Sequence, residues 1–118
     1  REGSARATVL IIISDGYDNG TPERITSTQN WPQLQAGDGG FSVFDSSNIT
    51  TRYTTYVYAT VYRWPGGNDI SGAWDTDSSN FIAPLVGDPN SNTTLLVGTN
   101  CFAALTSPVN NTYVIINK

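Results

Sequence analysis

The sequence lacks histidine and has a single cysteine, and these two features limit the chemistry open to the chain. Without histidine there is no imidazole to act as a general base, to activate a serine or cysteine nucleophile, or to bind a metal. Cys101 has no partner for a disulfide within the chain, and its apolar neighbours predict a small buried side chain. Hydrolases that depend on histidine, and metal sites that depend on it, are therefore excluded.

Positive charge is also scarce. Six of the 118 residues are Lys or Arg, they are scattered along the chain, and the net charge is -4. Nucleic acids and anionic membranes bind proteins through clustered Lys and Arg, so neither partner is expected. The longest apolar run, VLIII at residues 9–13, is far shorter than a membrane span, so no membrane insertion is expected.

The plentiful residues are those of extracellular β proteins. Thr, Ser, Asn, Gly and Tyr are common, and only 14% of the residues are charged. We therefore expect an extracellular or cell-surface protein. Asn-x-Ser/Thr sequons begin at Asn48, Asn92 and Asn110 in polar, turn-like segments, and these three residues are candidate glycosylation sites.

Strand patterns are frequent, whereas no window keeps the apolar spacing of a helix. Gly, Pro, Asn and Asp separate short β-rich segments, the arrangement of a sandwich, barrel or propeller. The polar segment 66–80 is predicted to be a solvated connection. The expected strands lie within 7–14, 23–27, 30–35, 41–45, 52–56, 60–64, 80–86, 93–99, 101–105 and 112–117.

A repeat is visible when Asp45 is placed over Asp88, an offset of 43 residues. Each copy then has an apolar strand, the Asp, a polar turn, two Thr and a second apolar strand. Such a unit is typical of a β-propeller blade. We predict an all-β, antiparallel fold of propeller-blade-like repeats of about 43 residues, with units at 41–83 and 84–118 and a partial unit at 7–40. A small β-sandwich is the alternative.

Several short motifs follow one another in a fixed order: DNGT, GDGGF, RYTTY, FIAP, DPN and LLVGTN. In order and spacing they resemble secreted bacterial β-propellers of the BNR/sialidase-like superfamily, over residues 10–105. The resemblance implies a propeller fold and secretion. Three features depart from that family: the Asp-box is missing, with TSPVNN where one would begin, Asp18 lacks the usual preceding Gln, and the chain is short.

The number of blades affects how the chain is expected to pack. At about 43 residues per blade it holds fewer than three, and closed propellers need about four to eight. Two blades alone leave apolar faces and open edges uncovered. We therefore expect a fragment of two to three blades of a larger propeller, a ring closed by self-association, or another packed arrangement. The segment 112–117 would complete a sheet in this chain or, by strand addition, in a neighbour.

Asp38 lies among Gly37, Gly39 and Gly40 and is the candidate catalytic residue. Glycoside hydrolysis generally needs two opposed carboxylates, and nothing in the sequence pairs another with Asp38. The resemblance implies an arginine cluster and a Tyr nucleophile for sialidases, but no arginine cluster is visible. The favoured interpretation is a tight loop in which the glycines supply positive φ and Asp38 accepts backbone N–H bonds.

Aromatic side chains offer a second kind of site. Trp31, Tyr56 and Trp64, together with Asp38, are the candidate ligand-binding residues, with carbohydrate as the ligand. The alternation of tyrosines along 56–62 instead favours packing across a sheet.

Asp15 and Asp18, in DGYDNG, are candidate calcium ligands. The segment does not match the EF-hand pattern, and a hairpin turn is the favoured interpretation. No other cofactor is expected.

The leading functional prediction is a non-catalytic extracellular structural or interaction module of β-propeller type, self-associating or associated with glycans. One alternative is a fragment of a glycoside-hydrolase or sialidase-like propeller enzyme, which must bring two carboxylates, or Arg residues and a Tyr, into one cleft. Another is a subunit of an extracellular fibre or surface layer that assembles by strand addition. The fold alone does not decide among them.

Overall fold

The computed structural model describes residues 18–24, 29–45, 47–48, 50–74, 76–91, 93–100, 102–106 and 112–116, with residue 73 and the last two ranges described by their backbone alone. Over these residues the fold is all-β and antiparallel, as predicted, with two short 3-10 turns. The elements are β1 (Thr21–Pro22), β2 (Gln33–Gln35), β3 (Ser42–Phe44), β4 (Arg52–Thr55), η1 (Val57–Ala59), β5 (Val61–Trp64), β6 (Asn68–Asp69), η2 (Gly72–Trp74), β7 (Leu85–Gly87), β8 (Thr94–Gly98), β9 (Phe102–Thr106) and β10 (Thr112–Ile116).

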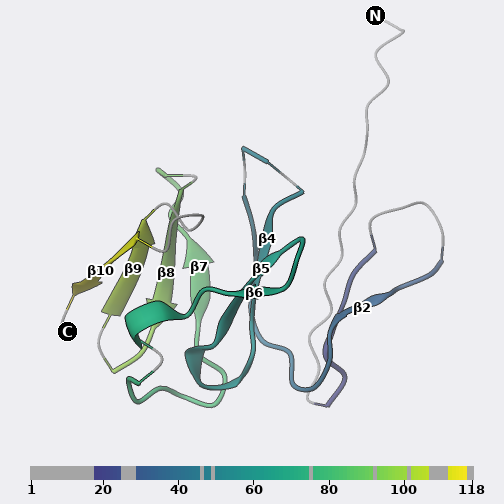
Figure 1. Ribbon diagram of the computed structural model, residues 1–118, viewed down its shortest axis with the longest axis horizontal. Coiled ribbons are helices and arrows are strands. Elements are labelled where there is room, and N and C mark those ends of the chain that lie inside the picture. Colours follow the sequence, from purple (N-terminus) through teal and green to yellow (C-terminus); the bar gives the residue numbers. More distant parts are fainter. Residues whose placement is uncertain are drawn as a thin grey trace, which may run out of the picture.

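The described residues form two four-stranded sheets and a two-stranded β1–β2 ribbon. Each larger sheet is a meander in chain order, β3–β4–β5–β6 and β7–β8–β9–β10, and both are open at their edges. The first strands of the two sheets, β3 and β7, lie side by side, and the ribbon lies beyond the first sheet (Figure 1). The C-terminal strand β10 pairs with β9 and so completes a sheet of its own chain. Two open sheets that share one core form a small sandwich-like fold.

The first hairpins of the two sheets have the same register. Every residue pair of the β3–β4 ladder has a counterpart 43 residues later in the β7–β8 ladder. The turns match as well: the Asp45 N–H donates to the Thr51 carbonyl at 3.1 Å. The Asp88 N–H donates to the Thr94 carbonyl at the same 3.1 Å. In both turns the Asp Oδ1 accepts the backbone N–H two residues later, at 2.8 Å.

This correspondence stops after the hairpins. Arg52 of β4 lies opposite Trp64, whereas Leu95 of β8 lies opposite Leu105, so the second connection is two residues shorter. The longer connection of the first sheet contains η1, where Tyr58 has left-handed backbone angles. The part that is alike in the two sheets is therefore the hairpin and its turn.

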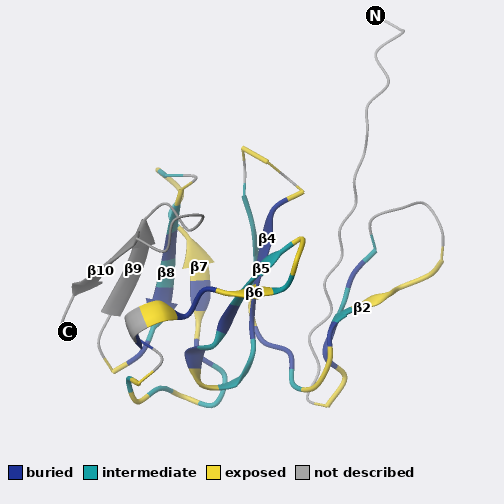
Figure 2. Ribbon diagram, in the orientation of Figure 1, coloured by how far each residue is buried: buried dark blue, intermediate teal, exposed yellow. Residues whose placement is uncertain are grey.

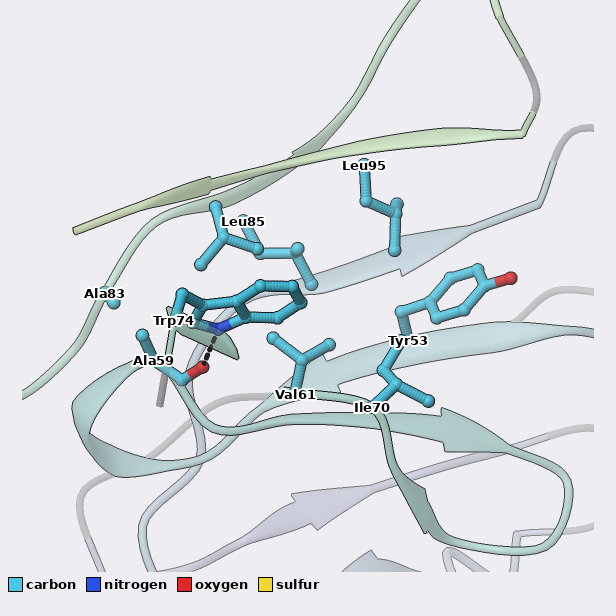
Figure 3. Packing of buried hydrophobic residues seen from close by; sticks show 9 residues of the cluster. Tyr53, Ala59, Val61, Ile70, Trp74, Ala83, Leu85 and Leu95 are labelled. Carbon is cyan, nitrogen blue, oxygen red and sulfur yellow. Dashed lines mark hydrogen bonds between the residues drawn. The ribbon is translucent and has the colours of Figure 1, made fainter. Parts of the chain in front are cut away.

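A hydrophobic core lies between the two sheets (Figure 3). Trp74 of η2 is fully buried there, and its indole Nε1 donates to the Ala59 carbonyl at 2.9 Å. Val61 of the first sheet and Val97 of the second are also fully buried. Because both sheets contribute to one cluster, each covers the apolar face of the other. The other buried members are Tyr53, Ile70, Ala83, Leu85 and Leu95.

The segment 66–80 is more than a solvated connection, contrary to the prediction from its polarity. It contains β6 and η2, and it places Ile70 and Trp74 in the core. The Ser71 side chain is also buried, and its Oγ accepts the Val61 N–H at 3.0 Å. Two apolar residues among many polar ones were too weak a pattern to predict this role, because neither shows a strand or helix period.

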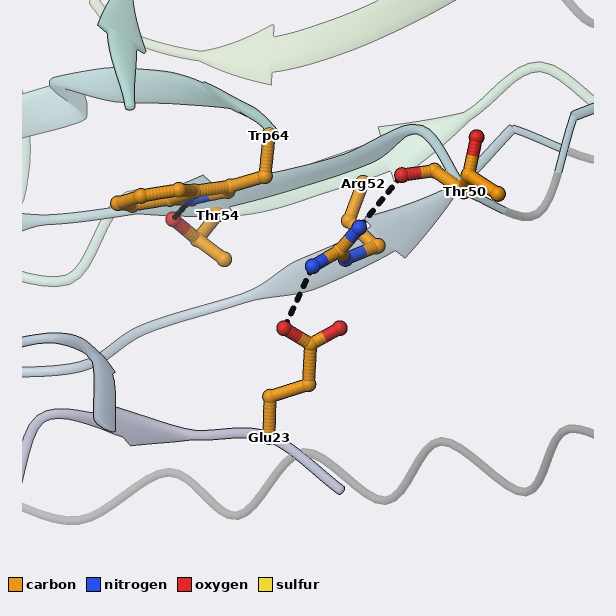
Figure 4. A network of polar contacts seen from close by, with 5 residues as sticks. All are labelled: Glu23, Thr50, Arg52, Thr54 and Trp64. Atoms are coloured by element: carbon orange, nitrogen blue, oxygen red, sulfur yellow. Dashed lines mark hydrogen bonds and ion pairs between the residues drawn. The ribbon is translucent and has the colours of Figure 1, made fainter. Parts of the chain in front are cut away.

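Polar side chains join the opposite face of β4 to the β1–β2 ribbon (Figure 4). Arg52 Nη2 lies 2.5 Å from Glu23 Oε2, and the two side chains are 10% and 5% exposed. Thr54 Oγ1 donates to Gln35 Oε1 at 2.6 Å and accepts from the Trp64 indole at 3.0 Å. All four residues of β4 are buried (Figure 2). This strand is therefore covered on both sides, by the apolar core and by these polar side chains. We call the latter the polar layer; it consists of Glu23, Gln35, Arg52, Thr54 and Trp64.

The outer face of the second sheet is different, because it exposes apolar side chains. Side chains alternate along a strand, so the buried Leu85, Leu95 and Val97 face the core while Val86 and Leu96 point away from it. Val86 is 49% exposed and Leu96 is half-buried. We refer to Val86 and Leu96 as the outer apolar pair.

The strands expected at 41–45, 52–56, 60–64 and 93–99 are confirmed. The one expected at 80–86 is shorter, because β7 begins only at Leu85. Packing of the tyrosines across one sheet is wrong for Tyr58, which lies in η1 and is 58% exposed. The strand expected at 7–14 lies outside the described residues, as does most of the one expected at 23–27.

Candidate functional site

The Asp38 carboxylate stabilises a turn in another part of the chain, at residues 18–19. Asp38 Oδ1 accepts the Asp18 N–H at 3.1 Å, across 20 residues of sequence. Of the three glycines around Asp38, only Gly37 has a positive φ, +85°, so the predicted role of Gly39 in the loop is wrong. A Cβ at Gly37 would lie 3.0 Å from the Tyr56 ring. The structure thus brings the Asp18 backbone to the Asp38 carboxylate and places Tyr56 against Gly37, and Asp38 stabilises the turn at Asp18.

Gly40 is needed for a different reason. Its φ is not in the left-handed region, contrary to the prediction, but a Cβ there would lie 2.2 Å from Thr55 Oγ1. That hydroxyl accepts the Phe41 N–H at 2.7 Å. Gly40 therefore permits a close approach of the loop to β4.

The predicted tryptophans make contacts of their own. Trp31 is 40% exposed, and the Arg24 guanidinium carbon lies 6.0 Å from the centre of its ring. Trp64 is half-buried, with its indole bonded to Thr54 in the polar layer and its ring tilted against Tyr62 at 6.4 Å. Trp64 is thus part of the packing between the ribbon and the first sheet.

The remaining predicted residues can be placed only in part. Asn48 is exposed in the β3–β4 turn, and its Oδ1 accepts from Thr50 Oγ1 at 2.6 Å, so the sequon forms a local turn. Asp15, Asn92 and Asn110 lie outside the described residues. Among the residues that the structure describes, no three of His, Cys, Asp and Glu gather as a metal site.

A cleft of about 330 Å³ lies between the turns of the two equivalent hairpins. We call it the hairpin cleft; its polar lining includes Asp45, Asp88 and Tyr53. Partial burial alone would raise the pKa of the Asp45 carboxyl, but hydrogen bonds from the turn and the charge of Arg63 outweigh it and hold this pKa below 3.8. Burial raises the pKa of the Tyr53 hydroxyl above 10.0, with Arg63 opposing the shift.

These shifts do not suit Asp45 as a general acid or Tyr53 as a nucleophile. A general acid needs a carboxyl that keeps its proton, and a nucleophilic Tyr needs a hydroxyl that loses it easily. The Asp45 oxygen is instead occupied by the N–H groups of Ser47 and Asn48. In the hairpin cleft, the Asp45 and Asp88 carboxylates therefore serve to cap the two turns.

Asp45→Asn is expected to make the stability of the protein less sensitive to acid. The folded pKa of Asp45 lies below its ordinary value of 3.8, so the stabilisation is present above that value and is lost as the pH falls through the lower folded pKa. Asn keeps the accepting oxygen but cannot ionise. Urea unfolding at several pH values should therefore show a shallower decline for the variant between about pH 4 and pH 2. Parallel declines for variant and wild type would contradict this expectation.

A second hollow, of about 360 Å³, lies at the opposite end of the second sheet, where β7 begins and β8 ends. We call it the polar hollow. Its walls are tied by the Asn100 N–H, which donates to the Ser78 carbonyl at 2.8 Å, and by the Gly98 N–H, which donates to the Pro84 carbonyl at 2.9 Å. Its lining residues are Ser78, Ser79, Asn80, Pro84, Gly98, Thr99 and Asn100.

An aromatic pair is connected through the chain to one wall of the polar hollow. Phe81 directly follows the lining residue Asn80, and its carbonyl accepts the Tyr58 N–H at 3.0 Å. The two rings meet edge to face at 5.4 Å. Sequence reasoning missed this arrangement because segments 20 or more residues apart build it and no short motif marks it.

Comparisons with protein-family models, with curated proteins and with solved structures gave no match. Among the described residues, no helix is long and apolar enough to cross a membrane.

Proposed function

We propose that this chain is a non-catalytic, extracellular structural or interaction module of β-propeller type that associates through the outer face of its second sheet. The observation that carries the proposal is the shared register of the two hairpins, 43 residues apart. Neighbouring propeller blades are likewise sheets whose strands follow one another in chain order and which pack face to face. Secretion and the relation to BNR/sialidase-like propellers are supported by the motifs in the sequence.

The register also tells which faces are equivalent. Val43 and Tyr53 of the first sheet face the second sheet, and their counterparts 43 residues later are Val86 and Leu96. The face that the first sheet buries against its neighbour is thus the face that the second sheet leaves exposed. An equivalent covering sheet would hide the outer apolar pair in the same way.

The enzyme alternative has less support. The hairpin cleft does bring Asp45, Asp88 and Tyr53 together. The pKa of Asp45 is lowered, which does not suit a general acid, and that of Tyr53 is raised, which does not suit a nucleophilic hydroxyl. A binding or structural role needs no such tuning, and we therefore retain the non-catalytic function.

Self-association of the purified chain tests the proposal. Across a dilution series, sedimentation should show a discrete oligomer that dissociates at low concentration, since the covering sheet is then supplied by a second copy. Val86→Lys should shift the protein to monomer, because a charge would be buried in the contact. Trp31→Lys, at an exposed aromatic away from this face, should leave the oligomer intact.

Two results would contradict association through this face. One is a wild-type chain that stays monomeric at every concentration. The other is an oligomer that Val86→Lys and Trp31→Lys affect equally.

A further inference from the structure

The ring of Tyr58 is held outward by an unfavourable backbone conformation. Tyr58 and Ala59 have φ of 54° and 62°, in the left-handed region that residues other than Gly, Asn and Asp rarely adopt. Ala59 is 1% exposed, and its carbonyl accepts the indole of the buried Trp74 at 2.9 Å. The core thus fixes the turn at Ala59, while the neighbouring Tyr58 side chain remains 58% exposed.

Contacts with Phe81 make this ring a fixed platform. The Tyr58 N–H donates to the Phe81 carbonyl at 3.0 Å, and the rings meet at 88°. A strained, core-anchored turn that keeps a large aromatic ring in solvent has no evident packing advantage. Such strained residues are concentrated at functional sites.

Uncharged polar groups surround the adjacent polar hollow. The side chains of Ser78, Asn80 and Asn100 are exposed at its walls, and no described residue of its lining is charged. Asp77, the nearest acid in the chain, accepts a hydrogen bond from Thr99 Oγ1 at 3.1 Å. Hydroxyl and amide groups can both donate and accept hydrogen bonds. Sugar hydroxyls also do both, so such side chains can satisfy them. No described residue of the lining is positively charged, so the hollow offers no counter-ion for an anionic ligand.

We propose that Tyr58, Phe81 and the polar hollow form a binding site for an uncharged carbohydrate. The apolar face of a sugar ring would pack on Tyr58, and its hydroxyls would bond to Ser78, Asn80 and Asn100. A volume of about 360 Å³ lies within the range of small-ligand sites, about 300–1,000 Å³. The site does not depend on how the sheets associate, since Val86 is on the outer face and Tyr58 is in η1.

Calorimetric titration with neutral oligosaccharides tests the site. The probes are cellotetraose, maltotetraose, xylotetraose and mannotetraose, with sialyllactose as a charged comparison. Wild-type protein should bind at least one neutral probe more tightly than sialyllactose. Tyr58→Asn should weaken binding about tenfold, as expected for the loss of one aromatic contact. Asn tolerates left-handed backbone angles, so this variant should remain folded.

Two further variants separate this site from the one predicted by sequence. Asn80→Ala should weaken binding severalfold through the loss of one hydrogen-bonding side chain. Trp31→Asn removes an exposed aromatic elsewhere and should leave the affinity within about twofold of wild type.

The proposal is overturned by any of three results. These are no binding of any neutral probe at millimolar concentration, unchanged affinity in folded Tyr58→Asn protein, or a loss of affinity in Trp31→Asn as large as in Tyr58→Asn.

Discussion

Trp74→Ala is expected to lower the free energy of unfolding by about 3–5 kcal/mol, the range for truncating a buried large aromatic side chain. Trp74 is fully buried between the two sheets and donates a hydrogen bond to Ala59. The substitution would leave both a cavity and an unpaired carbonyl. Because domains of this size have stabilities of about 5–15 kcal/mol, much of the total would be lost.

Urea unfolding followed by circular dichroism measures this effect. The protein concentration must be held constant, since association would add to the apparent stability. Trp74→Phe is the matched control: it keeps most of the ring, loses the indole hydrogen bond, and should cost less than the alanine variant.

The same variant tests whether the two sheets depend on one core. Val61 and Val97 lie in different sheets but pack in the same cluster around Trp74. Hydrogen exchange in Trp74→Ala protein should therefore speed up in β4 and β8 together. Faster exchange in one sheet alone, or a loss of stability below about 1 kcal/mol, would show that the sheets are independent.

Much of the architecture could be predicted because it depends on local patterns. Short apolar segments predict β3 and β8, and the Asp that begins each hairpin turn marks the offset between the two hairpins. Oδ1 of Asp45 and of Asp88 accepts the N–H two residues later, a capping role that the residue type itself favours. Secondary structure and the hairpin repeat could therefore be predicted from the sequence.

The candidate site at Tyr58, Phe81 and the polar hollow could not be predicted from the sequence, because its parts come together only through tertiary packing. Tyr58 stands in an alternating Tyr pattern that favours a strand, yet the anchoring of Ala59 in the core forces the turn of η1. Trp74 stands in a polar segment that was predicted to be a solvated connection, but it is fully buried in the core. In both cases, long-range contacts overrode the local pattern.

Arg52→Met is expected to destabilise the protein by about 3–5 kcal/mol, the range for removing one partner of a buried ion pair. Both side chains of the pair are almost fully buried, so the remaining Glu23 carboxylate would stay in a protein environment without its counter-charge. Glu23→Leu should have a comparable effect, because it leaves the Arg52 guanidinium unpaired. Urea unfolding of the two single variants at neutral pH measures both losses.

The double variant Glu23→Leu with Arg52→Met distinguishes a stabilising ion pair from a merely compensated one. In the wild type, Glu23 Oε1 and Arg52 Nε are buried without hydrogen-bond partners among the described residues, so the pair does not recover its full desolvation cost. Two apolar side chains of similar volume avoid that cost. The double variant should therefore be more stable than either single variant and within about 1 kcal/mol of wild type. Losses that simply add would mean that each side chain stabilises the ribbon through separate contacts, and the polar layer would then not act as one unit.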